Sequence, residues 1–156
     1  MAIAVYPGSF DPFTFGHLDI AIRAAKVFDT VHVVVVHNPA KNPLFTAAER
    51  VEMIQELLAG KGNFKVDSLE SGLLVDFCKE IKADVLVKGI RTTVDLDYEL
   101  PMAQVNKDLS GIETIFMPAD PGHGFVSSSL VKQVASLGGD ISKYVPANIA
   151  ARLKAK

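Results

Sequence analysis

Residues 6–17 form the first of four short segments whose residue types suit phosphate binding. The segment has two prolines and two glycines, offers the Ser9 hydroxyl, and ends with Gly16 and His17 where a helix is predicted to begin. A histidine in a first helical turn lies beside unpaired N–H groups and the positive end of the helix dipole, which attract phosphate. It can also donate a hydrogen bond to an oxygen that gains charge during a reaction. The alternative is that Gly16 and His17 only begin a helix.

The other three segments contribute cations and hydroxyl groups. Lys41 stands between two prolines and offers a compact charge for a phosphate, unless it is an ordinary solvated loop lysine. Lys88 and Arg91 lie on either side of Gly89 at the end of a predicted strand, where a glycine lets the backbone approach a ligand. Ser127–Ser129 open a predicted helix, and one of these serines is expected to be its N-cap. Together these residue types favour binding of a polyphosphate.

Other chemistries lack their signatures. The sequence contains no Gly-x-x-x-x-Gly-Lys-Ser/Thr, Gly-x-Gly-x-x-Gly or Gly-x-Ser-x-Gly motif, and no His/Cys cluster with metal-ligand spacing. The single cysteine, Cys78, lies among apolar residues of a predicted helix and is expected to be structural.

These segments must be positioned by elements that alternate between strand and helix. The apolar patterns predict strands at residues 2–6, 30–37, 64–69, 84–88 and 113–117. Helices are predicted at residues 16–28, 46–58, 71–82, 95–109, 127–137 and 146–154. Thr46 and Glu49 form a capping box, Ser71 is the expected N-cap of its helix, and Pro101 interrupts or delays the next one.

This alternation predicts an α/β fold: a single Rossmann-like domain with a five-stranded parallel sheet flanked by helices. In such folds ligands bind beyond the carboxyl ends of the strands, near the point where the strand order reverses. All four phosphate-binding segments follow predicted strands, so we expect them to meet at that edge.

Composition limits the remaining possibilities. The 156 residues are 49% hydrophobic and 22% charged, with a net charge of −2. No apolar run is long enough to cross a bilayer, the first residues lack a basic signal-peptide region, and one cysteine fits a reducing compartment. We therefore expect one cytoplasmic domain over residues 1–156 that binds neither membranes nor nucleic acid.

The segments, taken in order, resemble a known set of motifs. Thr14–His17 resembles the (H/T)-x-G-H signature of the nucleotidyltransferase superfamily, and Val126–Lys132 resembles its I-S-S-(S/T)-x-x-(R/K) signature. Pro7–Pro12, Lys88–Arg91 and Asp97–Glu99 are similar to segments of the bacterial phosphopantetheine adenylyltransferase family. The resemblance covers essentially the whole chain.

This resemblance implies transfer of the adenylyl group of ATP to 4′-phosphopantetheine, with Mg²⁺ as cofactor and a homohexamer as the assembly. It implies that His17 is catalytic and stabilises the transition state at the α-phosphate. The implied ATP-binding residues are Ser9, Phe10, His17, Gly89, Ile90, Arg91, Glu99, His123, Gly124, Phe125, Val126, Ser127, Ser128 and Ser129. The implied acceptor-binding residues are Ser9, Lys41, Leu74 and Lys88, and no protein side chain is implied as a metal ligand.

The sequence departs from the family pattern at several positions. Ser9 stands where threonine is also found and keeps the hydroxyl, whereas Lys88 stands where many relatives have arginine and loses the bidentate fork. His123 replaces an aromatic ring that often lies near the adenine.

Three alternatives remain open. The first is a sister transferase that uses CTP, or a different acceptor such as nicotinamide mononucleotide or glycerol 3-phosphate. A non-catalytic ATP sensor would tolerate loss of His17. An RNA-binding relative of class I tRNA synthetases is disfavoured by the small size and the acidic balance.

Overall fold

The computed structural model describes residues 1–156 and contains one sheet of five parallel strands. The strands are β1 (Ile3–Gly8), β2 (Thr30–Val36), β3 (Phe64–Leu69), β4 (Val85–Ile90) and β5 (Glu113–Pro118). The helices are α1 (Phe15–Ala25), α2 (Ala47–Leu58), α3 (Leu74–Glu80), α4 (Thr93–Ser110), α5 (Ser128–Ser136) and α6 (Ala147–Lys154), with a 3₁₀ helix, η1, at Pro121–His123. The predicted fold class is confirmed.

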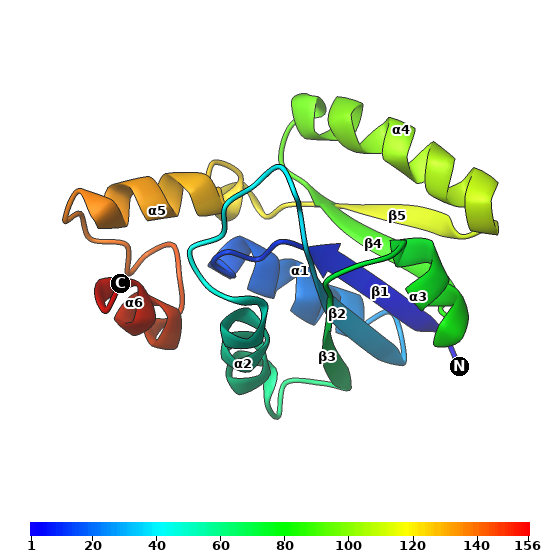
Figure 1. Ribbon diagram of the computed structural model, residues 1–156, viewed down its shortest axis with the longest axis horizontal. Coiled ribbons are helices and arrows are strands. Elements are labelled where there is room, and N and C mark those ends of the chain that lie inside the picture. Colours follow the sequence, from blue (N-terminus) through cyan, green and yellow to red (C-terminus); the bar gives the residue numbers. More distant parts are fainter.

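The sheet buries both faces, and each face has its own core. Tyr6, Val33 and Val87 lie on one face, in a cluster of 21 buried residues that α1, α2, α5 and α6 complete. The neighbouring residues Val5 and Leu86 point the other way, because side chains alternate along a strand, and they join a smaller cluster of six with α3. Figure 1 shows α3 and α4 on that side of the sheet, with α5 and α6 beyond one end of the strands.

The strand order β3-β2-β1-β4-β5 places the point of reversal between β1 and β4. From β1 the chain moves outward through β2 to β3, then returns to β4 on the other side of β1 and continues to β5 (Figure 1). The loops after β1 and β4 therefore leave neighbouring strands at the same edge and diverge, which opens a crevice between them.

A side-chain cap begins α2, whereas α3 begins without one. Thr46 Oγ1 accepts the Glu49 N–H at 3.1 Å, and the Glu49 carboxylate accepts the Thr46 N–H at 3.2 Å, so the predicted capping box is confirmed. The predicted cap at Ser71 is wrong. The helix begins at Leu74 with no side-chain cap, because Gly72 adopts a left-handed turn with φ +87° before it.

Helix α4 runs without a break from Thr93 to Ser110, across Pro101. It begins earlier than predicted, because Thr92 Oγ1 accepts the Asp95 N–H at 3.2 Å and caps it. It ends at Gly111, whose φ of 76° forms a left-handed C-cap. Pro101 is an exposed interior residue, so its missing N–H leaves a carbonyl open to solvent.

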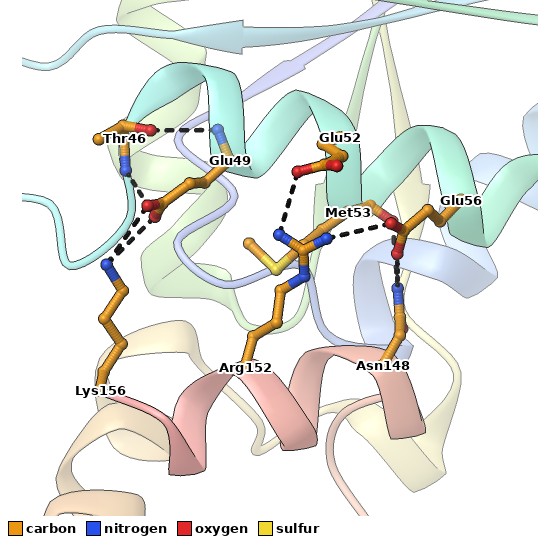
Figure 2. A network of polar contacts seen from close by, with 8 residues as sticks. All are labelled: Thr46, Glu49, Glu52, Met53, Glu56, Asn148, Arg152 and Lys156. Carbon is orange, nitrogen blue, oxygen red and sulfur yellow. Dashed lines mark hydrogen bonds and ion pairs between the residues drawn. The ribbon is translucent and has the colours of Figure 1, made fainter.

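Helix α6 closes the larger core and is tied to α2. Figure 2 shows Arg152 reaching Glu52 and Glu56 at 3.1 and 3.0 Å, and Lys156 reaching Glu49. The segment before α6 also reaches α1, since the Phe15 N–H donates to the Tyr144 carbonyl at 2.9 Å. No helix has the length and apolar character required to cross a membrane.

Candidate active site

The first turn of α1 fixes the orientation of His17. Thr14 is the N-cap: its Oγ1 accepts the His17 N–H at 3.3 Å, and its own N–H donates to His17 Nδ1 at 3.0 Å. The imidazole thus takes the place that Glu or Gln usually holds in a capping box. Because Nδ1 accepts a hydrogen bond, the neutral ring carries its proton on Nε2. His17 therefore presents Nε2–H as a donor.

The surroundings of His17 keep its ring uncharged. Burial, and after it the charges of Arg91 and Lys88, lower the pKa of His17 from 6.5 to about 3. The rings of Phe10 and Phe13 pack against the imidazole, with centroids 5.1 and 5.4 Å away. At neutral pH His17 can donate a hydrogen bond but does not act as a cation.

Ser9 and Phe10 follow β1 and shape the loop before His17. Phe10 has a φ of 50°, an uncommon backbone conformation for a bulky residue, and such strain occurs often at functional sites. The whole residue is only 3% exposed, and its ring packs edge-on against Tyr6. The Phe10 ring therefore belongs to the packing around His17.

Two cations lie at this edge, Lys88 near the end of β4 and Arg91 just after it, and each is paired with a carboxylate of α4. Arg91 Nε lies 3.1 Å from Asp95, and its Nη1 donates to the Val126 carbonyl at 3.0 Å. Lys88 lies 3.4 Å from Glu99. Arg91 thereby joins the end of β4 to the loop before α5, two segments that are 35 residues apart.

Gly89 and Ile90 lie between these two cations, at the end of β4. A Cβ at Gly89 would lie 3.1 Å from Ile20 Cγ1, so packing of β4 against α1 accounts for the glycine without a ligand. Ile90 is the last residue of β4 and is partly buried.

The three serines before and in α5 have separate roles. Ser127 is the N-cap and accepts the Leu130 N–H at 3.1 Å. Ser128 Oγ donates to the Pro12 carbonyl at 2.8 Å and so fastens this turn to the loop after β1. Ser129 is exposed. The preceding residues His123, Gly124, Phe125 and Val126 connect η1 to this turn.

The side chains before the serines point to different places. His123 stacks on Phe15 with ring centroids 6.4 Å apart, whereas Val126 is buried and Phe125 is 63% exposed. His123 is thus placed on the first residue of α1, close in sequence to His17.

Lys41 and Leu74 lie apart from the residues described so far. Lys41 is exposed, and its N–H donates to the Asn38 carbonyl at 3.0 Å. Leu74 begins α3 and packs against the smaller core, on the face opposite to that of Phe10 and Phe13. The structure brings His17, Lys88, Arg91 and the serine turn together but does not tie Lys41 or Leu74 to them.

Two buried charged residues were not predicted as part of the site. Asp11 accepts hydrogen bonds from the Leu44 and Phe45 N–H groups at 2.8 and 3.0 Å, and from Lys132 Nζ at 2.9 Å. Burial alone would raise the pKa of Asp11, but Lys132 and the two amides outweigh it and hold the pKa below its usual value. This carboxylate stays charged at neutral pH.

Arg50 is the second of these residues and is 4% exposed. Its Nη1 donates to the Ser9 carbonyl at 2.8 Å, and its Nε donates to the Phe45 and Thr46 carbonyls at 3.1 and 3.3 Å. One signal for it was present in the sequence. Arg50 precedes Met53 and Ile54 by three and four residues, which places a charge on the apolar stripe of α2.

Known proteins resemble this chain over nearly its whole length. The family profile described as cytidylyltransferase-like matches residues 5–134. A phosphopantetheine adenylyltransferase of Clavibacter michiganensis is 52% identical over 151 residues, covering 95% of this chain and 93% of its own. That of Leifsonia xyli is 56% identical over 149 residues, with 94% of each chain covered.

Solved structures share the fold at much lower sequence identity. A candidate nicotinate-nucleotide adenylyltransferase from Vibrio parahaemolyticus superposes with a TM-score of 0.71 at 17% identity, covering 98% of this chain and 91% of its own. The lipopolysaccharide core biosynthesis protein of Thermoplasma volcanium gives a TM-score of 0.58 at 23% identity, covering 77% and 97%.

The fold, the capped His17 and the family match define a nucleotidyltransferase of the cytidylyltransferase-like class. Within that class, the chain belongs to the phosphopantetheine adenylyltransferase family, as identities of 52% and 56% over nearly full length show. The resemblance drawn from the sequence motifs is confirmed.

Proposed function

We propose that this chain transfers the adenylyl group of ATP to 4′-phosphopantetheine, giving dephospho-coenzyme A and pyrophosphate. The observation that carries the proposal is the neutral His17 donor beside Lys88 and Arg91, in a chain that is 52% identical to a phosphopantetheine adenylyltransferase. This reaction is a step of coenzyme A synthesis.

The chemistry requires alignment and charge stabilisation more than proton transfer. An oxygen of the acceptor phosphate attacks the α-phosphorus, a new P–O bond forms, and the bond to the bridging oxygen breaks as pyrophosphate leaves. A phosphate monoester is already a competent nucleophile, so no general base is needed. His17 Nε2–H donates to an α-phosphate oxygen as its charge grows, and Arg91 and Lys88 offset the phosphate charge.

The two substrates occupy adjacent parts of the crevice. We assign the nucleotide to Ser9, the Phe10 backbone, Gly89–Arg91, Glu99 and the stretch His123–Ser129. We assign the acceptor to Ser9, Lys41, Leu74 and Lys88. The ion pairs of Lys88 with Glu99 and of Arg91 with Asp95 compensate these cations until a phosphate replaces the carboxylate as partner.

We also propose that Mg²⁺ acts in the reaction. No group of three His, Cys, Asp or Glu side chains could hold a metal ion. Mg²⁺ usually keeps several waters and binds largely through substrate phosphates. In that position it would neutralise charge on the triphosphate, and no side chain of the chain is assigned as its ligand.

The proposed assembly is a cytoplasmic homohexamer of single-domain chains comprising residues 1–156. Support comes from α4, which buries none of its residues and carries an exposed apolar stripe: Val94, Tyr98, Met102, Val105 and Leu109. These residues recur every three to four positions and so lie on one helix face, where a second copy could cover them.

The proposal is tested by pyrophosphate release from ATP and Mg²⁺, with 4′-phosphopantetheine, nicotinamide mononucleotide or glycerol 3-phosphate offered separately. We expect release with phosphopantetheine alone. Release only with another acceptor would contradict the substrate assignment but keep the His17 chemistry. ATP binding without release from any of the three would favour a sensor.

A further inference from the structure

The backbone of Leu44–Thr46 is hydrogen-bonded to two buried charged residues. Asp11 accepts the N–H groups of Leu44 and Phe45, and Arg50 donates to the carbonyls of Phe45 and Thr46. Both charged residues are nearly inaccessible, at 5% and 4% exposed. We call Asp11 and Arg50, with the segment they hold, the 44–46 clamp.

The clamp joins two loops that carry proposed substrate contacts. Arg50 Nη1 donates to the carbonyl of Ser9, and Asp11 belongs to the same loop after β1. The segment Leu44–Thr46 is the end of the loop after β2. The same loop carries Lys41, three residues before Leu44. A displacement of the clamp would therefore move Lys41 relative to Ser9.

The cost of the arrangement indicates that it serves more than folding. Arg50 is buried, its hydrogen bonds all go to carbonyl oxygens, and no carboxylate forms an ion pair with it. Burying a charge without an opposite charge is expensive, and an apolar side chain would fill this position on α2 at lower cost. Three fixed hydrogen bonds from one rigid guanidinium, however, define the relative position of two loops, which an apolar side chain cannot do.

Arg50 and Thr46 of the clamp also line a cavity beside the loop that carries Lys41. A cavity of about 340 Å³ is lined by Arg50, Thr46 and Pro43 together with Val35, His37, Ala47, Leu69 and Glu70. Arg50 therefore borders open space on the side of the loop that carries Lys41, whereas its Nη1 reaches the loop that leads to His17.

We infer that Asp11 and Arg50 are positioning residues, which set the acceptor phosphate in line with the α-phosphorus by holding the loop of Lys41 against the loop of Ser9. The inference rests on the proposed function. Neither residue is assigned a contact with substrate; they act through the backbone of residues 44–46 and through Ser9. Asp11 also holds Lys132 of α5, so the same clamp reaches the serine turn.

The inference is tested with Arg50→Lys, which keeps the charge but cannot reproduce the planar fork. Since a misplacement of about 1 Å can lower a rate about a hundredfold, we expect kcat to fall at least about tenfold and the acceptor KM to rise about tenfold. The Kd for ATP, measured by calorimetry, should stay within about twofold, because ATP alone does not need the two loops in register. The calorimetric stoichiometry counts folded sites and separates misplacement from partial unfolding.

Arg152→Lys is the matched control, because Arg152 also reaches α2 but contacts only exposed carboxylates (Figure 2). It should leave kcat, the acceptor KM and the ATP Kd unchanged. If Arg50→Lys does not fold, Asp11→Asn tests the same clamp from the other side with little change of shape, and the same rise in acceptor KM is expected.

Three outcomes would contradict the inference. An active wild type whose Arg50→Lys and Asp11→Asn variants keep the acceptor KM within about twofold would overturn the clamp alone. An equal loss of ATP and acceptor affinity would reduce it to general structural support. A wild type that binds ATP but transfers to no acceptor would instead overturn the proposed function, and the clamp inference would fall with it.

Discussion

His17 combines the cap of α1 with the donor proposed for catalysis. Its Nδ1 is occupied by the Thr14 N–H at 3.0 Å, which fixes both the tautomer and the ring orientation. The neutral ring follows from burial and two neighbouring cations. The cap with Thr14 therefore sets the orientation of the His17 ring, and the surrounding crevice sets its protonation state. A substitution can keep the cap and change the chemistry.

His17→Gln should separate the cap from the chemistry. Glutamine at this position completes an ordinary capping box through its side-chain oxygen, so stability should be kept, while its amide N–H groups lie in a different place from the imidazole Nε2–H. We expect kcat to fall about 10²- to 10³-fold, as when an oxyanion donor is removed, with little change in ATP affinity. Steady-state kinetics and ATP calorimetry on one preparation check this. A parallel loss of affinity and rate would refute a role specific to the transition state.

The pKa of His17 also predicts how stability depends on pH. Its folded value of about 3 lies below the ordinary 6.5, so between these pH values the unfolded chain binds a proton that the folded chain does not. Stability should therefore be lost as the pH falls from 6.5 toward 3. Urea unfolding at several pH values should show a shallower loss in His17→Gln than in the wild type; equal slopes would contradict the assigned pKa.

Lys41 is predicted to act on the acceptor side alone. Lys41→Ala should raise the KM for phosphopantetheine about tenfold or more and leave the ATP response nearly unchanged, because it removes one phosphate-binding charge. Lys61→Ala is a suitable control, since Lys61 is also exposed but precedes β3, at the opposite edge of the sheet. A change only in the ATP response would reverse the two subsites.

At the scale of elements, α6 is held by its apolar face more than by the ion pairs in Figure 2. Ile149 has no exposed surface and lies in the larger core, whereas Arg152 and its partners Glu52 and Glu56 are substantially exposed. Exposed ion pairs contribute little, because water screens them and the long side chains lose freedom.

Ile149→Ala should therefore lower the free energy of unfolding by about 2–4 kcal/mol, through lost burial and the cavity left behind. Arg152→Ala should be far milder. Denaturant titration of both variants decides between the two interactions. A larger loss in Arg152→Ala would show that the polar network, and not the core, attaches α6.

The elements differed in how far the sequence alone could predict them. The capping box of Thr46 and Glu49 and the strand Phe64–Leu69 rest on local chemistry, and both were correct. The start of α3 was wrong because a serine before a glycine can be a turn as readily as a cap. The 3₁₀ helix Pro121–His123 was missed, since three residues carry no periodicity.

The same division applies to the site: residues placed by topology could be predicted, whereas residues that act through distant backbone groups could not. His17, Arg91 and the serine turn follow strands that must end at one edge, so topology alone brings them together. Asp11, and Arg50 through its Nη1, reach backbone groups more than 30 residues away in sequence, and nothing local specifies which amide or carbonyl they reach. The charge of Arg50 on an apolar helix stripe was the available sign of such a role.

At the scale of the whole molecule, α4 is the element that the single chain leaves uncovered. Tyr98, Met102, Val105 and Leu109 are 78, 57, 51 and 50% exposed, and together they form a row of exposed apolar side chains on one helix face. The proposed assembly accounts for it, because copies of the chain would bury this stripe.

Val105→Glu should accordingly dissociate the assembly, since a charge at an apolar interface must be desolvated on association. Sedimentation velocity should then show a smaller species, with the chain still folded by circular dichroism. Leu137→Glu is the control, because Leu137 is 80% exposed but follows α5. A wild type that sediments as a monomer would contradict the proposed assembly, whatever the variants do.

The hydrogen bond from the Phe15 N–H to the Tyr144 carbonyl has a consequence for synthesis on the ribosome. Translation delivers Thr14, Phe15 and His17 early, but the residue that completes the amino end of α1 emerges only near the close of the chain. At about 5–20 residues per second, the nascent polypeptide spends most of its translation time with the helix that holds His17 unfinished. Transfer activity should therefore be absent from ribosome-bound intermediates and begin only after residue 144 has left the exit tunnel.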